Sequence, residues 1–459
     1  MQAGQNKQAT KASTFKLDMK EKVSYGLGDL GNGLMFQVAQ LYLLKFYTDV
    51  LGISPYWGGM VFLITKFVDA VTDTLTGTFV DARTPGPKGK FKPFILYGTG
   101  FLALATIAAF VAPDWSETGK IIYAFVSYNL MSLAYTIVNI PYGSLSSSMT
   151  TNAADRTSLA VFRNLAAQSS ILIAGVIVIP MVNQFPNPAL GYPVVVGGLS
   201  LLGVLCHILC YKGVEERFVS KKPRVKGDGV KSIKNLLTNA QFGVLSVYTI
   251  LSIGAMFLKS GVQLYYFEYA LGNEGLVGIV STLSLVAIVP SALFATPIVE
   301  KFGKKNVALF GTTGFAIFEF VNYFFTGDET ISFLVVNFLS YVFLGFANTV
   351  AFAFVSDVVD YSHLKNGNRT EGIIYSGYSF VRKVAQGFAG FIPGLALTAI
   401  GYVANQPQTA ETISGMRSVY FLFPAVLAVA SVVIFLLFYK LTDDKHAKVI
   451  EELSDKGEL

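Results

Sequence analysis

The stretch GTFVDARTPGPKGK, residues 77–90, follows the second long apolar run of this chain. A shorter counterpart, TPIVEKFGKK at residues 296–305, follows the eighth run. Another pair matches in the same way, because ADRTSLAVFR at 154–163 opens the fifth run and GNRTEGIIYS at 367–376 opens the eleventh. Related segments at equivalent positions indicate an internal repeat, so the sequence predicts two similar halves of six apolar runs each.

Composition places these runs in a membrane. The chain has 459 residues, of which 53% are hydrophobic and only 14% are charged, whereas about a quarter of the residues of a soluble protein are charged. A run of about 20 apolar residues is long enough to cross the hydrocarbon core as a helix. The runs show no alternation of polar and apolar residues at period two, which a transmembrane β-barrel would require. The predicted class is therefore an all-α membrane protein.

Twelve transmembrane helices are expected, near residues 26–48, 57–80, 94–112, 121–143, 158–181, 192–212, 243–270, 276–298, 307–326, 331–356, 372–400 and 417–439. They form two pseudo-symmetric six-helix bundles, at 25–212 and 242–440. A middle loop at 213–241 joins the bundles, and polar tails at 1–24 and 441–459 flank them. No apolar core precedes the first run, so we expect no cleaved signal peptide.

Basic residues predict the orientation of the helices. Lys and Arg gather in the loops at 81–93, 213–241, 301–305 and 365–369, while the alternate loops carry almost none. Short loops rich in Lys and Arg stay in the cytoplasm. We therefore expect both termini and the middle loop on the cytoplasmic side of the cell membrane.

Several motifs in order resemble one family. They are KVSYGLGDLGNG at 22–33, LYLLKFYTDVLGIS at 41–54, FVDAVTD at 67–73, GKFKPFILYGT at 89–99, TIVNIPYGSL at 136–145, VVDYSHLKNGNRTEGIIYS at 358–376 and GYVANQPQT at 401–409. Together they resemble the glycoside–pentoside–hexuronide:cation symporters of the major facilitator superfamily, most closely the glucuronide and xyloside branch. The resemblance covers about residues 22–443 and implies an inner-membrane symporter that couples sugar entry to H⁺, Na⁺ or Li⁺ by alternating access, without a cofactor.

The second run carries Lys66, Asp69 and Asp73 near the middle of its length. Residues three and four apart lie on one face of a helix, and charges at the bilayer centre are costly unless they face a cavity and serve a function. Two carboxylates one turn apart could bind Na⁺, or could share a proton because their mutual repulsion raises one pKa. The alternative is a structural salt bridge between Lys66 and Asp69, which would leave Asp73 without a charged partner.

The resemblance implies that Asp69 and Asp73 are the coupling-cation site. Thr72 and Thr136 are expected to add oxygen atoms, which would favour Na⁺ as the bound metal ion, whereas the acid pair alone would suffice for H⁺. Lys383 matches a lysine that the family places opposite these acids, and it is expected to neutralise them when no cation is bound.

Polar residues on other spans are candidates for sugar binding. They are Asn32, Gln37 and Gln40 on the first span, Tyr135, Thr136 and Asn139 on the fourth, Arg163 on the fifth, and Tyr378, Ser379, Arg382 and Lys383 on the eleventh. An interhelical hydrogen bond is the structural alternative for Gln37, Gln40 or Ser379. Arg163 could instead serve an inner gate.

Three departures from the melibiose carriers bear on the substrate. Asn139 stands in place of a sugar-binding aspartate, Asn32 and Gly33 replace a Lys-Asp pair, and Gly143 stands where those carriers have tryptophan. A melibiose or other galactoside symporter is therefore only the alternative. The basic Arg382 could bind the carboxylate of a glucuronide, or it could serve packing in a carrier for a neutral xyloside or pentoside. The residues leave both open.

The loop after the second span is a candidate cytoplasmic gate. Gly77, Asp81 and Arg83, with Gly303, Lys304 and Lys305 after the eighth span, are expected to bridge helix ends in one state of the transport cycle. Plain anchoring by positive charge is the alternative.

Other function classes find little support. No metal-ligand spacing, nucleophile triad or phosphate loop indicates an enzyme, and nothing indicates nucleic-acid binding. Cys206 and Cys210, on either side of His207, are expected to serve packing. A passive sugar facilitator would lack a group able to bind a cation, which Asp69 and Asp73 argue against. The expected partners are a sugar, a coupling cation and the lipid bilayer, and the chain is expected to act as a monomer.

Overall fold

The computed structural model describes residues 16–150, 153–218, 236, 238–326, 329–367 and 371–456. The chain divides into two compact units, Met1–Arg224 and Val225–Leu459. Within the described residues both units are helical, and the only bridge between extended segments joins Gly86 and Gly89. The boundary between the units falls in the middle loop that the sequence analysis placed at 213–241.

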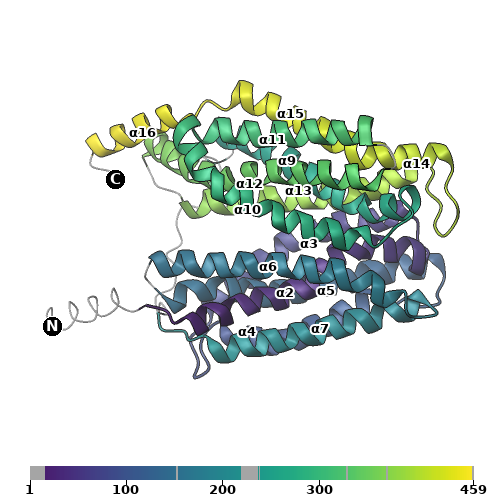
Figure 1. Ribbon diagram of the computed structural model, residues 1–459. Helices are drawn as coiled ribbons and strands as arrows, with labels where there is room; N and C mark the ends of the chain where they lie inside the picture. The colour runs from purple at the N-terminus through teal and green to yellow at the C-terminus, as the bar shows by residue number, and fades with distance from the viewer. Residues whose placement is uncertain are drawn as a thin grey trace. The chain divides into compact units, whose positions relative to one another are not determined.

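In the described part of the N-terminal unit there are six long helices, which Figure 1 labels α2 to α7. They are α2 (Met19–Lys45) with its π-helical end η1 (Phe46–Leu51), α3 (Pro55–Ala82), α4 (Lys92–Ala109), α5 (Glu117–Met149), α6 (Ala153–Val182) and α7 (Pro188–Gly213). Local sequence explains several starts. Asp18 and Glu21 form a capping box at the start of α2, and proline occupies the first turn of α3, α4 and α7, where no backbone donor is lost.

The C-terminal unit repeats this plan and adds a terminal helix. Its elements are α9 (Ala240–Tyr265) with η2 (Tyr266–Ala270), α10 (Leu276–Phe302), α11 (Lys304–Val321) with η3 (Asn322–Thr326), α12 (Thr330–Asn366), α13 (Glu371–Ala399), α14 (Ala410–Arg417) continued by η4 (Ser418–Leu422) and α15 (Phe423–Phe438), and α16 (Asp443–Asp455). The predicted spans therefore all correspond to helices, although α5 and α12 extend beyond their predicted ends.

Eight of these helical segments, within the part of the chain that is described, are long and apolar enough to cross a membrane. Large apolar side chains on them point outward, as Leu104 and Leu201 do with 69% of each exposed. The long helices that fall outside this set include α3 and α13, which carry the intramembrane charges Lys66, Asp69 and Lys383. Charged residues lower the mean hydropathy of these two helices.

Helices α2 and α9 end in the same way. LYLLKFYTDVLG at 41–52 and VQLYYFEYALG at 262–272 both pass from α-helix into a π-helical segment and then into a glycine. Gly52 has φ +77° and Gly272 has φ +64°, a left-handed conformation that glycine adopts without steric cost. This shared ending is structural evidence for the internal repeat.

Packing explains the two cysteines, as predicted. Cys206 and Cys210 on α7 are buried free thiols. Between them His207 is fully buried, with Nδ1 2.7 Å from the hydroxyl of Thr99 and Nε2 3.0 Å from the carbonyl oxygen of Gly28. The imidazole thus connects α7 to α4 and α2 inside the N-terminal unit.

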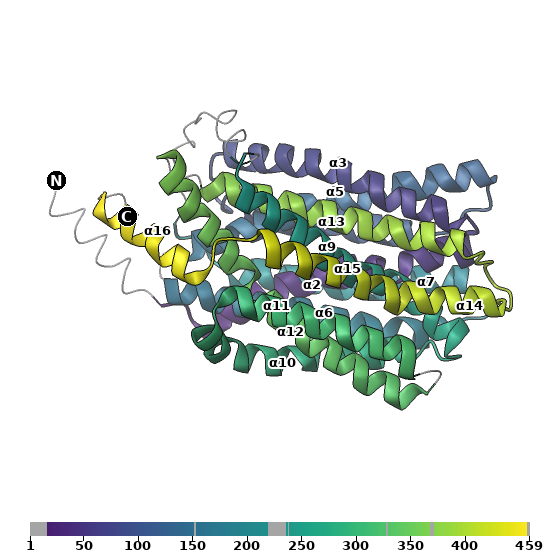
Figure 2. The same ribbon diagram turned by 90° about the horizontal axis from the view of Figure 1, so that it is seen from above.

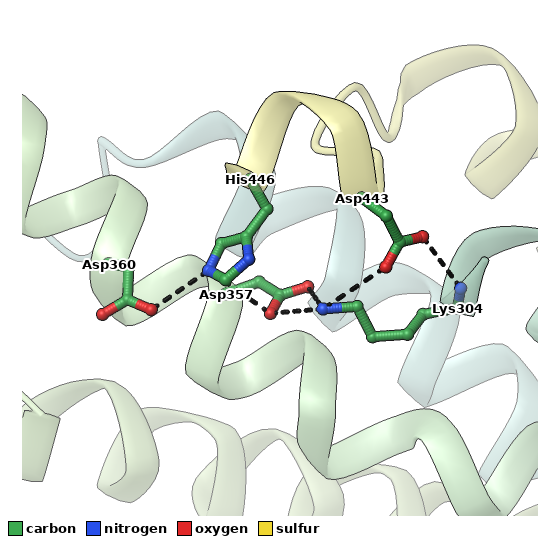
Figure 3. Close-up of polar contacts among 5 residues, drawn as sticks. All are labelled: Lys304, Asp357, Asp360, Asp443 and His446. Atoms are coloured by element: carbon green, nitrogen blue, oxygen red, sulfur yellow. Dashed lines mark hydrogen bonds and ion pairs between the residues drawn. The ribbon is translucent and has the colours of Figure 1, made fainter. Parts of the chain in front are cut away.

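Helix α16 occupies the region that the sequence analysis described only as a polar tail. Its Val449 and Leu453 are buried in the same apolar cluster as Phe354 and Val358 of α12. Polar contacts at its first turn hold it in place: Asp443 accepts a 2.8 Å hydrogen bond from the backbone N–H of Lys304, and His446 Nε2 lies 3.0 Å from Asp360 (Figure 3). Apolar spacing at i and i+4 within this short segment was the signal for a docked helix.

Candidate functional site

The two predicted acids on α3 both receive hydrogen bonds from α5, the helix beside it (Figure 2). Ser132 Oγ donates to Asp69 Oδ1 over 2.6 Å, and Thr136 Oγ1 donates to Asp73 Oδ1 over 2.7 Å. Each pair is separated by 63 residues, so the two helices run parallel in a fixed register. Successive turns of α3 therefore meet successive turns of α5.

Lys66 gives Asp69 a second partner. Its Nζ lies 3.2 Å from Asp69 Oδ2, and both side chains are 9% exposed. The ammonium also lies 5.2 Å from the centre of the Phe36 ring on α2, a distance at which a cation is attracted to the aromatic face. The salt bridge considered as the structural alternative is thus present. Asp73 nevertheless has a partner, because Thr136 donates a hydrogen bond to it.

The two threonines differ in position. Thr136 is buried and donates directly to a carboxylate, whereas Thr72 is half-buried and donates to the backbone carbonyl of Asp69 over 3.3 Å. Ser132 is a site residue that the sequence analysis missed. It could have been found as the position one turn before Thr136 on α5, since the acids also lie one turn apart.

This arrangement offers hard oxygen ligands of the kind that Na⁺ prefers, and it offers carboxylates that can take up a proton. Within the described residues no three His, Cys, Asp or Glu side chains lie close enough to hold a metal ion. A cation at Asp69 and Asp73 would therefore complete its shell with hydroxyl and carbonyl oxygens, such as those of Ser132 and Thr136.

Three of the predicted sugar ligands lie along the α2–α5 contact. Asn32 Nδ2 donates to Asn139 Oδ1 over 3.4 Å, and Asn32 is 1% exposed. Tyr135 stacks on Phe36, with ring centres 4.3 Å apart. Amides and an aromatic face next to the acid pair are the groups that sugar hydroxyls and the C–H face of a sugar require.

Two other predicted side chains of α2 lie near these groups. Gln40 donates to the hydroxyl of Tyr128 on α5 over 3.3 Å, which is the interhelical hydrogen bond considered as its structural alternative. Gln37 is half-buried on the same helix.

Arg163 lies in the same unit, where α6 contacts α2. Its Nε is 3.4 Å from Asp29 Oδ2 on α2, and its guanidinium lies 5.3 Å from the centre of the Tyr142 ring. About a third of the Arg163 side chain remains exposed, at 36%.

The candidates on the eleventh span lie on α13 of the C-terminal unit. Tyr378 is 2% exposed and belongs to the apolar core of that unit, Ser379 is exposed, and Arg382 and Lys383 are half-buried. Burial of Tyr378 favours a packing role. The expectation that Lys383 neutralises the acids of α3 stays a prediction.

The gate candidates also lie partly in the N-terminal unit and partly in the C-terminal unit. Gly77 is half-buried on α3, and Arg83 places its guanidinium 5.0 Å from the centre of the Phe94 ring on α4. The side chain of Asp81 lies outside the described residues. In the C-terminal unit Gly303 adopts φ +82° between α10 and α11.

Lys304 follows Gly303 and binds three helices together (Figure 3). Its Nζ contacts both oxygens of Asp357 on α12, at 2.7 and 2.5 Å, and lies 3.5 Å from Asp443 on α16. Lys304 was a predicted gate residue, but its partners Asp357 and Asp443 were not predicted, because they come from distant segments of the chain. The neighbouring pair of His446 and Asp360 was not predicted either.

Comparison with known proteins identifies the family and the fold of this chain. The sequence model described as MFS/sugar transport protein matches residues 24–443. Three related proteins are the "Uncharacterized symporter YjmB" of Bacillus subtilis (37% identical, 98% of this chain, 99% of the relative), the "Putative sulfoquinovose importer" of Escherichia coli (36%, 96% and 95%) and the "Glucuronide carrier protein homolog" of Escherichia coli (32%, 97% and 97%). The crystal structure of the nucleoside transporter NupG matches with a TM-score of 0.64 at 16% identity, covering 92% of this chain and 100% of NupG, and shows the shared fold.

Proposed function

Since the chain belongs to the MFS/sugar transport protein family and is a multi-pass membrane transporter, we propose that it imports a sugar or glycoside together with H⁺ or Na⁺. The chemistry is secondary active transport by alternating access, without a covalent step. The proposal places the chain in the cytoplasmic membrane, with both termini inside the cell, because the basic loops predict that orientation.

The contact between α3 and α5 carries the proposal. Asp69 and Asp73 lie one turn apart near the middle of α3, and each accepts a hydroxyl hydrogen bond from α5. Packing alone gives no reason for such a pair, because charge inside a membrane protein is costly and usually serves transport. The acid pair also lies far from both ends of α3, which argues against a role in anchoring the helix at the membrane surface.

Lys66 provides a reason for exchange at this site. In the absence of a coupling cation, its ammonium compensates Asp69 over 3.2 Å. A proton or Na⁺ arriving at the carboxylates would compete with this ammonium for the same charge. Binding would then weaken the Lys66 contact within α3 and change how α3 packs against α5 and α2. Lys383 on α13 is proposed as a further counter-charge, and Lys383→Ala is expected to abolish coupled accumulation while the protein still folds.

An acidic sugar is the substrate class we favour. Two of the relatives carry glucuronide and sulfoquinovose in their names, and both compounds combine a sugar ring with an anionic group. In this chain the partly exposed guanidinium of Arg163 could bind a carboxylate or sulfonate by charge-assisted hydrogen bonds. Asn32, Asn139 and Tyr135 would bind the ring. A neutral xyloside is the second candidate, supported by the family motifs of the sequence.

Purified protein in proteoliposomes tests the proposal. Counterflow and uphill uptake of radiolabelled glucuronide and xyloside would be measured with and without Na⁺ at two pH values. We expect Asp69→Asn/Asp73→Asn to retain counterflow and lose uphill uptake, because exchange of sugar needs the sugar site while accumulation needs cation coupling. Uphill uptake by this variant at the parental level would refute cation coupling at α3.

A passive facilitator would behave differently in the same experiment. It would equilibrate sugar without accumulation in the parental protein, whatever gradient of H⁺ or Na⁺ is imposed. Accumulation driven by one gradient and not by the other identifies the coupling ion.

A further inference from the structure

A second group of buried polar side chains lies inside the C-terminal unit. Lys259 on α9 places Nζ 2.5 Å from Glu319 Oε1 on α11, and these side chains are 2% and 0% exposed. Ser340 on α12 donates to the same oxygen over 2.5 Å. One oxygen of Glu319 therefore takes both donors, while Oε2 has no hydrogen-bond partner among the described residues.

Two asparagines lie one turn away. Gly311 of α11 lies against Ala347 of α12, and Glu319 lies against Ser340, so the two helices run antiparallel and these contacts fix their register. Asn322, three residues after Glu319, then lies opposite Asn337, three residues before Ser340. Both are fully buried at 0% exposure, and neither the oxygen nor the nitrogen of either side-chain amide has a partner within the described chain.

Tyr420 on η4 borders this group from another helix. Its ring centre lies 4.8 Å from Lys259 Nζ, and its hydroxyl is buried with no partner in the described part of the chain. Three residues earlier, Arg417 donates to the carbonyl oxygens of Asn322 and Tyr323 over 3.4 and 2.6 Å. The segment with Tyr420 therefore packs against η3, which continues α11 and begins at Asn322. We call Lys259, Glu319, Asn322, Asn337, Ser340 and Tyr420 the Glu319 cluster.

The chemistry of the unbonded atoms selects the ligand. Two amide nitrogens are donors, two amide oxygens and Glu319 Oε2 are acceptors, and the Tyr420 hydroxyl can be either. A cation would satisfy only the oxygens and would lie beside the ammonium of Lys259. An anion would satisfy only the donors and would face the carboxylate. Water donates and accepts, and buried water typically makes two to four hydrogen bonds of this kind.

We propose that the Glu319 cluster binds internal water, which bridges Glu319 Oε2 to the amides of Asn322 and Asn337 and to the Tyr420 hydroxyl. Buried polar groups in proteins almost always have a partner in protein or ordered water. The bound water hydrates the Lys259–Glu319 pair and so reduces the penalty for holding both charges in the interior. This inference concerns the C-terminal unit and is independent of the proposed coupling site on α3.

Hydroxyl-radical labelling by synchrotron radiolysis tests the proposal directly, because side chains beside bound water are oxidised even when bulk solvent cannot reach them. We expect Tyr420 to be labelled at least several-fold faster than Tyr47. Tyr47 is an equally buried tyrosine whose hydroxyl donates to the carbonyl oxygen of Ala124 over 3.2 Å. Labelling of Tyr420 as slow as that of Tyr47 would overturn the proposal.

A double variant gives a second test, in which a hydrated and a dry cluster should change the melting temperature in opposite directions. Leucine branches as asparagine does but cannot bind water, so Asn322→Leu/Asn337→Leu should abolish the labelling of Tyr420 and lower the melting temperature. In a dry cluster the same variant removes unbonded amides from an apolar interior and should raise the melting temperature. Thr106→Val is the control, because that buried hydroxyl donates to the carbonyl oxygen of Leu102 in its own helix α4 over 2.8 Å. It should leave the labelling of Tyr420 unchanged.

A bound cation is the remaining occupant to distinguish. In the Asp69→Asn/Asp73→Asn background, a melting temperature that rises with NaCl but not with choline chloride, and stops rising after Glu319→Gln, would assign the cluster to Na⁺ and overturn the proposal. A melting temperature that does not distinguish the two salts is the result expected for water.

Discussion

Ser132 on α5 donates a 2.6 Å hydrogen bond to the Oδ1 atom of Asp69 on α3. This bond joins two helices that are distant in sequence, and it does so near the middle of α3, far from both helix ends. Because Lys66 holds the other oxygen, both oxygens of this carboxylate have a partner.

Removing the hydroxyl of Ser132 should weaken coupling without unfolding the protein. A hydrogen bond to a charged group contributes about 1.5–3 kcal/mol, so Ser132→Ala should change the apparent affinity for the coupling cation by roughly tenfold or more. The measurement is initial uptake against cation concentration or pH. Ser127→Ala is the matched control, since that buried serine on the same helix donates to the backbone carbonyl of Ala124 rather than to a carboxylate. Equal effects of the two variants would contradict the role of Ser132.

The two threonines should separate in the same assay. Thr136 donates to the carboxylate of Asp73, whereas Thr72 donates to the backbone of its own helix. Thr136→Val should therefore reduce apparent cation affinity by roughly tenfold, while Thr72→Val should change it by less than about twofold because only a local backbone bond is lost. A larger effect at Thr72 would show that its hydroxyl turns toward the cation during transport.

Arg163 should matter for an acidic substrate and not for a neutral one. If its guanidinium binds a carboxylate, Arg163→Gln should raise the KM for a glucuronide by about tenfold or more and leave that for a neutral xyloside within about twofold. Asp29→Asn is the control, because it removes the partner at 3.4 Å and keeps the base. An equal loss for both sugars would indicate that Arg163 serves the packing of α6 on α2.

Stability should depend on Asp155 at the start of α6. Burial alone would raise the pKa of this carboxyl, but hydrogen bonds from Lys22 and from the backbone N–H of Leu17, at 2.8 and 2.9 Å, outweigh burial and lower its pKa. A lowered pKa stabilises the folded state above the unfolded pKa of about 3.9, and this contribution is lost as the pH falls through the folded value. Asp155→Asn should reduce stability at pH 7 by about 1–3 kcal/mol.

Melting curves between pH 7 and pH 3 check this expectation. The difference between Asp155→Asn and the parental protein should be full above about pH 5 and should shrink below about pH 4. A difference that stays constant over this range would mean that the charge of Asp155 contributes nothing.

Lys304 should hold α16 against the C-terminal unit. Lys304→Ala removes the contacts to both oxygens of Asp357, which is 3% exposed, and leaves that carboxylate without its nearest cation. We expect a loss of about 1.5–3 kcal/mol and faster proteolysis within α16. Lys301→Ala, at an exposed position at the end of α10, is the control and should have little effect. Unchanged proteolysis of α16 in Lys304→Ala would show that Val449 and Leu453 alone are sufficient to dock it.

Much of the fold follows from local sequence. Every predicted span corresponds to a helix, because a run of about 20 apolar residues has few alternatives in a membrane. The acid pair on α3 was also predictable, since helical periodicity alone places Asp69 and Asp73 on one face. Packing was expected for Cys206 and Cys210 because the sequence holds no other thiol, and both are buried. The tail helix α16 was missed because its thirteen residues are mostly polar on average, so the segment resembled a polar tail although its few apolar positions follow the helical period.

Partners across helices did not follow from the sequence. The hydroxyl of Ser132 on Asp69, the guanidinium of Arg163 on Asp29 and the carboxylate of Glu319 under Lys259 each join residues at least 60 positions apart. Such contacts depend on the register and rotation of helices packed against each other, and these are set by many side chains at once.

The sequence by itself determined that this chain crosses the membrane many times in two related halves, and that two acids lie on one helix face. The physical reason is that hydropathy and helical period are properties of neighbouring residues. The tertiary structure alone decided that Lys66 compensates Asp69 while Thr136 supports Asp73, and that Glu319 shares one oxygen between Lys259 and Ser340. Those outcomes depend on which helix turns face each other once the chain has packed.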